Sequence, residues 1–550
     1  MRHDVCGETL YQFLFGTARC EKLRSPEATG GRGSEEVGLN RDLLVFKADF
    51  KADALSVTEK SPLLPQRPAQ QWTSPVPSSI DPDLVGGSSS GTPDLKTQEA
   101  GHRRLLLAVT AAMMATMSYG LSVGYTSPAL PDIRQRMDLS DDQSDWFGSL
   151  LNIGGIFGAL AGGQLIRFIG RKFTLLLATA VSVAGWLCIV SGTVPGVLFF
   201  GRALTGAFMG MTSITAPVFV SEVSPKNIRG LLNVMCSMSY SVGVLLAYTM
   251  GKWLHYDWLA AASMTPPVLM ALILPWLADS PRWLFQVGRD EDALRAIHFY
   301  GRSDADEEYK AMRANVDTTE RFQLSELKQP YIYMPFMMTL LALFLQQFSG
   351  IAVLLLYTYD IFTLAGWKLS AADSSIVVGT VPLVGIALAV VLTDRIGRRI
   401  LFLFSLAVSA VSLATLGTFY HLKQIRDASF VEAFGWLPLA SLCVFFLGFS
   451  VGLRPLPPIL MGELLPIRIK GFASGILMCF FFSCATFTTK EYHPMMTFFG
   501  QGGIYWFYAS FMVAGFVLVM VFLPETKGKS LEDIETIFGK NREPPKENGC

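Results

Sequence analysis

Acidic and basic residues recur at corresponding places in the two halves of the chain. Glu222 is followed seven residues later by Arg229, and Glu463 is followed by Lys470 after the same step. A carboxylate and a basic group on neighbouring helices form a partly dehydrated ion pair, which is expensive to break by losing one partner. Such pairs suit a latch between the halves, made when one side is closed and broken when it opens. The residues assigned to this latch are Arg171, Lys172, Glu222, Arg229, Asp394, Arg398, Arg399, Glu463 and Lys470.

Each of these basic residues has a simpler interpretation, since arginines at helix ends also set topology or extend to the membrane interface. The duplication of the whole set favours the latch. Arg454 is a separate case, because it lies inside an apolar run, where a charge is costly and usually functional. We expect it to sit near the outer mouth, or to pair with Asp360 or Asp373, or to extend to the outer interface.

The remaining polar residues favour neither a cofactor, a metal site nor an enzyme. The eight cysteines contain no CxxC pair, and the six histidines are scattered singly without ligand spacing. We find no catalytic constellation and no nucleotide-binding loop. The formal net charge is zero, so no basic excess points to nucleic acid.

The elements that position the charged residues are long apolar runs. The chain is 51% hydrophobic and 16% charged, with a mean hydropathy of +0.38, whereas soluble domains average about 25% charged residues. Runs of about 20 residues match the length of a helix that crosses a bilayer. Because lipid offers no partners to backbone N–H and C=O groups, we expect these runs to be helices, which pair these groups internally. The predicted spans are 105–126, 143–165, 173–191, 196–219, 231–250, 257–278, 332–355, 373–393, 400–420, 434–461, 471–490 and 503–523.

These runs predict an all-α membrane protein with twelve transmembrane helices in two pseudo-symmetric six-helix bundles, because duplicated halves are typical of transporters. Gly154, Gly158 and Gly162 repeat every four residues and predict a close helix contact. The basic residues of alternate loops place both termini in the cytosol. The predicted parts are a disordered tail at 1–102, a bundle at 103–278, a helical linker at 279–331, a second bundle at 332–523 and a tail at 524–550.

Six short motifs, in order and on the expected helices, show that residues 103–537 resemble the sugar porters of the major facilitator superfamily. Finer features, such as Tyr125 to Pro131 and Met461 to Pro466, are similar to arthropod facilitated trehalose transporters and class III facilitative glucose transporters. The six motifs are Gly201–Arg202 with Gly206, Ser221 to Pro225 with Arg229–Gly230, Ser280 to Leu284, Gln346 to Ile351, Asp394 to Arg399, and Pro524 to Gly528.

The resemblance implies that Gln346 and Gln347 hydrogen-bond sugar hydroxyls, since an amide both donates and accepts. One of the two glutamines could instead hold helices together. Tyr357 matches a family aromatic residue that gates the outer side or packs. Ser237 aligns with a solute-binding glutamine of the fifth helix, so it is included among the solute contacts.

Several of the family's polar positions are apolar here. Because each buried polar partner left unpaired costs about 1–3 kcal/mol, sugar affinity should fall or the solute should be less polar. This chain has Ala352 and Pro382 where the family has asparagines, Pro458 where it has a tryptophan, and Phe481–Phe482 where it has Asn–Trp.

The expected activity is facilitated diffusion (uniport) of a sugar, trehalose or a hexose, by alternating access. Proton-coupled relatives carry a carboxylate in the first helix, where this chain has Ser122 and no Asp or Glu between 105 and 126. A proton-coupled symporter and a sugar sensor with little transport remain alternatives.

Glu59 with Leu63 and Leu64 looks like an acidic dileucine sorting signal, although so short a match also arises by chance. It would dock into a clathrin adaptor. We therefore expect a multi-pass protein of the plasma membrane that cycles through endosomal or lysosomal membranes, with the lipid bilayer and a small sugar as its other partners.

Overall fold

The computed structural model describes residues 95–225, 228–301, 329–426, 428–465, 470–525 and 527. These residues are helical almost throughout, and twelve of their helices are long and apolar enough to cross a membrane. The predicted all-α architecture with twelve transmembrane spans is therefore confirmed.

The first half folds into six spans, with two short helices after the sixth. Its helices are α2 (Leu95–Gly124), α3 (Thr126–Met137), α4 (Asp141–Phe168), α5 (Gly170–Ser191), α6 (Pro195–Val223), α7 (Arg229–Gly251), α8 (Tyr256–Ser263), α9 (Thr265–Ile273), the 3₁₀ turn η4 (Leu274–Trp276), α10 (Pro281–Gln286) and α11 (Asp290–Phe299).

The second half repeats the pattern of six spans. Its helices are α13 (Pro330–Gln347), α14 (Ile351–Leu356), α15 (Thr358–Ala365), α16 (Ala371–Ile396), α17 (Arg398–Ile425), α18 (Ala428–Phe434), α19 (Leu437–Val451), α20 (Leu456–Leu464), α21 (Lys470–Lys490) and α22 (Tyr492–Phe522).

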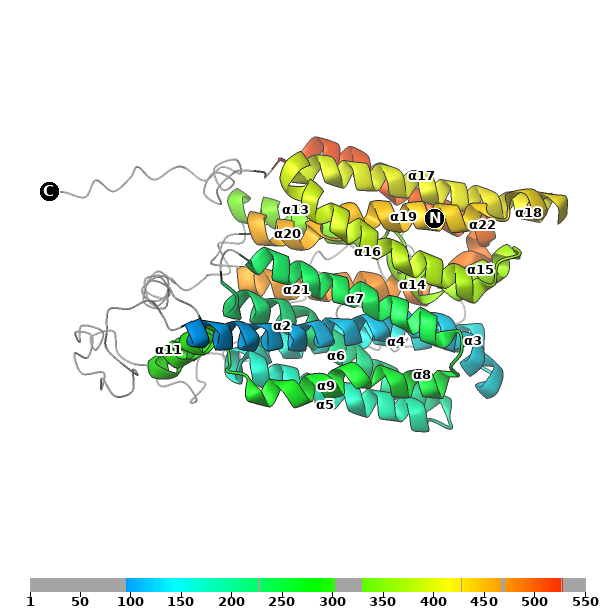
Figure 1. Cartoon of the computed structure of the whole chain (residues 1–550). Coiled ribbons are helices and arrows are strands. Elements are labelled where there is room, and N and C mark those ends of the chain that lie inside the picture. The colour runs from blue at the N-terminus through cyan, green and yellow to red at the C-terminus, as the bar shows by residue number, and fades with distance from the viewer. Residues whose placement is uncertain are drawn as a thin grey trace, which may run out of the picture. The chain divides into compact units, whose positions relative to one another are not determined.

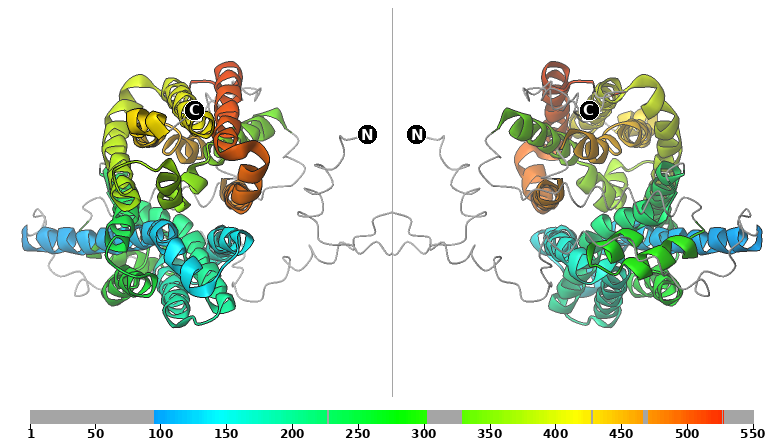
Figure 2. Two further views of the ribbon diagram at one scale, coloured as in Figure 1. Left: turned by 90° about the vertical axis from the view of Figure 1, so that its right-hand side faces the viewer. Right: turned by 90° about the vertical axis from the view of Figure 1, so that its left-hand side faces the viewer.

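The spans run antiparallel and form two bundles, one from each half (Figure 1). Figure 2, which looks along the helices, shows the first half in blue to green on one side and the second half in yellow to red on the other. The bundles meet where α4 packs on α21 and where α7 packs on α16. We call the end that carries α10 and α11 the linker end, and the opposite end, which carries α3, α15 and α18, the α3 end.

Three spans that the sequence predicted as single runs are interrupted. The sixth is divided at Met264, just before Pro266 and Pro267, and the seventh turns at Gly350, whose φ is 77°. The tenth is interrupted between Val451, where α19 ends, and Leu456, where α20 begins. Proline removes a backbone donor, and glycine adopts positive φ without strain, so these residues place the breaks. The first span also begins earlier than predicted, at Ala100, within a helix that starts at Leu95.

The predicted glycine contact on the second span is confirmed. A Cβ atom added to Gly154 would lie 2.1 Å from the carbonyl oxygen of Ala203, and one added to Gly158 would lie 2.0 Å from that of Ala207. The backbones of α4 and α6 therefore touch, which holds the second and fourth spans in one position.

Candidate functional site

The seventh span is interrupted just after its paired glutamines, where α13 ends at Gln347. Both side chains are buried, with exposed fractions of 8% for Gln346 and 3% for Gln347. The Nε2 of Gln346 donates to the carbonyl oxygen of Arg454 at 3.4 Å. Among the described residues, neither glutamine Oε1 has a hydrogen-bond partner. The pair therefore offers two buried acceptors to a donor group such as a hydroxyl.

Arg454 lies in the break of the tenth span and reaches across to α7 in the other half. Its Nη1 donates to Ser241 Oγ at 2.8 Å, and its Nη2 donates to the carbonyl oxygen of Ser237 at 3.3 Å. The guanidinium carbon lies 4.6 Å from the centroid of the Tyr240 ring, and Tyr119 of α2 packs edge-on against that ring at 4.9 Å. Residues of three other spans thus gather around this arginine, including Gln346 of the seventh.

This position corrects the expectation that Arg454 sits near the outer mouth, pairs with Asp360 or Asp373, or extends to the outer interface. Its contacts are with residues at the middle of α7, and Asp373 instead forms an ion pair of 2.5 Å with Lys252. The physical reason is the helix break between Val451 and Leu456, which holds Arg454 opposite the middle of α7, where the serines supply its acceptors.

Ser237 belongs to the same cluster, although by a different contact from the one predicted. Its side chain is exposed, and its hydroxyl donates to the carbonyl oxygen of Asn233 at 3.4 Å. Arg454 binds its carbonyl oxygen. The structure therefore brings Ser237 and Gln346 together through one arginine.

Tyr357 lies in a second cluster, at the α3 end. Its hydroxyl donates to Asp145 Oδ1 at 3.0 Å, and its ring stacks on Tyr492 with centroids 4.3 Å apart. Asp145 is fully buried, and the Nδ1 of His493 lies 2.6 Å from the same Oδ1. Asp145 comes from the first half and its partners from the second, so this cluster joins the two bundles.

Further polar contacts continue the junction between the halves. Asn152 Nδ2 donates to Thr489 Oγ1 at 3.3 Å, and Lys490 pairs with Asp142 at 2.5 Å. Outside the spans, burial raises the pKa of Asp360 above its ordinary value, against the opposing effect of nearby Arg134 and His493. The α3 end is closed by side chains of both halves.

The linker end holds the ion pairs of the predicted latch. Arg171 Nε lies 2.7 Å from Glu222 Oε2, with both side chains nearly buried at 9% and 8% exposed. Arg398 Nη2 lies 3.1 Å from Glu463 Oε1, with exposed fractions of 17% and 29%. Each of these two pairs joins helices of the same half, so neither bridges the halves in this conformation.

The other latch residues contribute differently. The Nζ of Lys172 donates to the carbonyl oxygen of Leu277 at 2.7 Å, and Arg399 donates to that of Met520, so each binds the end of the last span of its half. Arg229 reaches the carbonyl oxygen of Ser224 at 3.5 Å. The side chains of Asp394 and Lys470 lie outside the described residues, as do the sorting residues Glu59, Leu63 and Leu64.

Two carboxylates that sequence reasoning missed hold the start of the third span of each half. Asp279 Oδ1 accepts from the backbone amides of Arg171 and Lys172 at 3.2 Å each. Glu525 accepts from the amides of Arg398 and Arg399 at 3.0 and 3.1 Å. The signal in the sequence was an acidic residue directly after the last span of each half. Burial raises the pKa of Asp279, against the lowering effect of these amides.

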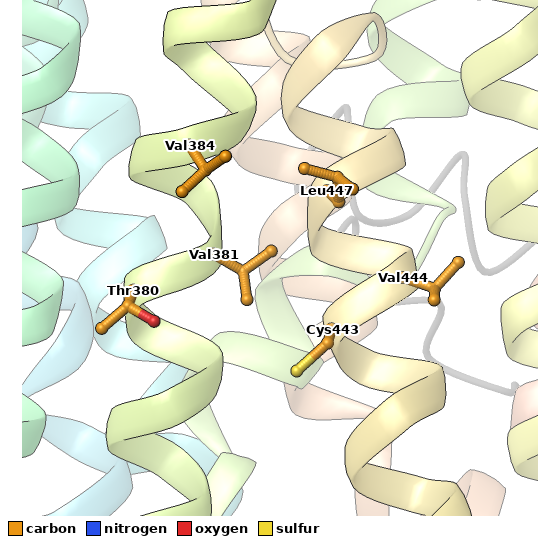
Figure 3. A pocket seen from close by; sticks show the side chains of 6 residues that line it. All are labelled: Thr380, Val381, Val384, Cys443, Val444 and Leu447. Atoms are coloured by element: carbon orange, nitrogen blue, oxygen red, sulfur yellow. The ribbon is translucent and has the colours of Figure 1, made fainter.

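A shallow groove of about 300 Å³ lies elsewhere, between α16 and α19 (Figure 3). Apart from Thr380 its lining is apolar, and Val384 and Val444 are exposed on the outer surface of the bundle. With a single hydroxyl it offers little to a polar solute, so the cluster around Arg454 is the better candidate site.

Comparison with known proteins places this arrangement among transporters. A family model described as "Sugar (and other) transporter" matches residues 99–538. The facilitated trehalose transporter Tret1 of Anopheles gambiae is 34% identical over 440 residues, which are 78% of this chain and 55% of the relative. The chain therefore spans about half the length of that relative.

Two further comparisons agree on the family and the fold. The solute carrier family 2, facilitated glucose transporter member 8 of Mus musculus is 32% identical over 455 residues, which are 79% of this chain and 94% of the relative. The structure of the proton:xylose symporter XylE bound to 6-bromo-6-deoxy-D-glucose superimposes with a TM-score of 0.66 at 21% identity, over 79% of this chain and 99% of that one. This last likeness concerns the fold alone.

Proposed function

We propose, from the premise that this chain belongs to the sugar (and other) transporter family, that it carries a sugar across a membrane by facilitated diffusion. Trehalose and hexoses are the proposed solutes, since the similar proteins are named as trehalose and glucose transporters. The observation that carries the proposal is the pair of unpartnered amide oxygens of Gln346 and Gln347 beside a break in the seventh span. Two acceptors of this kind fit the hydroxyls of a sugar.

The proposed cycle is alternating access between the two ends of the bundle. In this conformation the contacts of Asp145 with Tyr357 and His493 hold the α3 end shut. We assign the linker end and both termini to the cytosol, from the basic residues of its loops. Solute entry from outside then requires the Asp145 contacts to break.

The latch remains part of this proposal. Arg171 with Glu222 and Arg398 with Glu463 lie at the linker end, each pair within one half. When the linker end closes, the two pairs would approach each other across the interface and form ionic contacts between the halves. Opening the linker end would then cost free energy, because it breaks desolvated ionic contacts between the halves.

Uniport is preferred to proton symport on the composition of the first span. Ser122, at the position where coupled relatives carry a carboxylate, is buried and donates to the carbonyl oxygen of Ser118 at 2.9 Å. A hydroxyl in this setting does not titrate near neutral pH. Acidification of the cytosol on sugar addition to loaded cells would instead indicate symport.

The test is sugar flux through the purified full-length protein in liposomes, with labelled trehalose, glucose, fructose and polyols. We expect saturable uptake down the gradient. Gln346→Leu should raise the half-saturation concentration about two- to tenfold, since a neutral hydrogen bond contributes about 0.5–1.5 kcal/mol. Gln329→Leu, on the same span but exposed at the linker end, is the matched control. Saturable binding without flux would favour a sugar sensor.

The membrane of residence is a separate proposal. We place the protein in the plasma membrane, with cycling through endosomal or lysosomal membranes by docking of Glu59, Leu63 and Leu64 into a clathrin adaptor. The support is the sequence of this segment alone.

A further inference from the structure

We propose that the site around Arg454 prefers a hydroxylated carboxylate, a sugar acid of the aldonate or uronate class, over the neutral sugar of the same size. The inference rests on the proposed function, because it assigns a solute class to the same cluster of residues. It starts from a charge that the neighbouring protein groups leave without a counter-charge.

The guanidinium of Arg454 is surrounded by neutral groups. The guanidinium contacts the Ser241 hydroxyl, the Ser237 carbonyl and the face of the Tyr240 ring. Among the described residues no carboxylate pairs with it, and the titratable groups nearest to it are the neutral phenols of Tyr240 and Tyr119. A cation at this depth of a membrane protein is costly and ordinarily meets an anion.

A second arginine inside the bundle shows how this fold satisfies such a charge without a solute. Arg202 is fully buried, and it donates to the Ser122 carbonyl at 2.9 Å and to the Thr126 hydroxyl. These acceptors lie at the end of α2 and the start of α3, where the negative end of the α2 dipole also favours a cation. Arg454 faces the middle of α7 and has no helix end to receive it.

Arg454 is also accessible, in contrast to Arg202. Its side chain is half-buried, and Ser237, which it contacts, is exposed on the face of α7 that meets the other half. A guanidinium has five N–H donors, and the two contacts to α7 use two of them. The remaining donors fit a carboxylate, which arginine binds through two parallel hydrogen bonds.

The neighbouring glutamine defines the rest of the solute. The Nε2 of Gln346 donates to the Arg454 carbonyl, and its Oε1 lacks a donor. A solute that places a carboxylate on Arg454 and a hydroxyl on Gln346 satisfies both groups at once. Because the cluster holds one cation, it balances a single negative charge better than the two charges of a phosphate ester.

The test compares labelled gluconate with labelled glucose in liposomes that contain the purified full-length protein. We expect gluconate uptake to exceed glucose uptake at equal concentration and to rise with an inside-positive potential, because a single anion carries charge. Glucose uptake should not respond to the potential. Glucose 6-phosphate in place of gluconate as the preferred solute would overturn the carboxylate assignment.

Variants separate the solute contact from a structural role. Arg454→Gln should lower the ratio of gluconate to glucose uptake about tenfold or more, since it removes a charge-assisted pair, and Arg454→Lys should keep part of the preference. Arg167→Gln, which removes an exposed arginine from the linker end of α4, is the matched control and should leave the ratio unchanged. An unchanged ratio in Arg454→Gln would overturn the proposal.

A measurement on the unaltered protein covers the case in which the Arg454 variants do not fold. Gluconate should raise the melting temperature of the wild-type chain at lower concentration than glucose does. Equal effects of the two solutes would overturn the inference. Glucose flux without gluconate flux would overturn the inference but support the proposed sugar transport. Gluconate binding without flux of any solute would support the anion site but overturn the proposed transport function.

Discussion

At the level of single residues, the two ion pairs of the linker end differ in burial although they occupy corresponding positions. Arg171 and Glu222 are almost withdrawn from solvent and form two short contacts, at 2.7 and 2.8 Å. Glu222 also accepts a hydrogen bond of 2.5 Å from Ser280. The second pair is more exposed and longer, at 3.1 Å. The same motif therefore contributes differently to stability in the two halves.

Glu222→Gln should destabilise the protein by about 3–5 kcal/mol, because it leaves the guanidinium of Arg171 buried without its counter-charge. Glu463→Gln, the matched change in the more exposed pair, should cost about 1 kcal/mol or less. Thermal unfolding of the two variants in detergent compares them. The double variant Glu222→Gln with Arg171→Gln should recover part of the loss. Equal losses in the two single variants would show that burial does not set the difference.

The sequence alone selected Arg171 and Glu222 as latch residues, because the second half repeats the motif, but it did not assign the pairs. It also missed the carboxylates that hold the start of the third spans. Asp279 accepts amide hydrogens from residues more than a hundred positions away, and an acidic residue directly after a span does not show by itself which residues it contacts. Arg454 was recognised as a costly charge, yet its partners depended on a backbone turn that the composition does not reveal.

At the level of helices, close backbone contact and breaks decide how the spans pack. The glycine repeat of α4 was readable from its spacing, since small residues at every fourth position line one helix face. The breaks in the sixth, seventh and tenth spans were not placed, because the apolar composition continues through them. A hydropathy pattern reports the length of a span and carries little information on where its hydrogen bonds are interrupted.

Gly158→Val should separate α4 from α6, because its first side-chain atom would lie 2.0 Å from a backbone oxygen that cannot move alone. The expected cost is about 1–3 kcal/mol, with a lower yield of monodisperse protein on size-exclusion chromatography. Gly163→Val on the same helix is the control, since nothing lies within 4 Å of an added Cβ atom there. Normal behaviour of the Gly158 variant would refute the packing argument.

At the level of the whole molecule, the polar contacts between the halves extend from the α3 end to the middle of the bundle. The cluster around Asp145 contains a fully buried carboxylate at the α3 end, and Arg454 contacts the middle of α7. A protein that alternates between two open states must exchange contacts of this kind for others of similar strength. A substitution in the Asp145 cluster should therefore change the equilibrium between the closed and the open form of the α3 end.

Asp145→Asn should favour opening of the α3 end, because it weakens the charge-assisted bonds to Tyr357 and His493. A cysteine introduced at Ser149, in a background without native cysteines, should then react several-fold faster with a membrane-impermeant maleimide. Asp142→Asn removes an exposed pair with Lys490 and should change the labelling rate little, since such surface pairs contribute about 0–1 kcal/mol. Equal rates in the two variants would count against Asp145 as the closing contact.

The carboxylates after the last span of each half have a mechanical consequence. Asp279 fastens the start of the first half's third span to the end of its sixth, and Glu525 does the same in the second half. Each bundle is thereby cross-linked at the linker end, so that bending a bundle would strain both its third and its last span. We therefore expect the freedom to move to lie at the interface between the bundles, with each half moving as a rigid body about that interface.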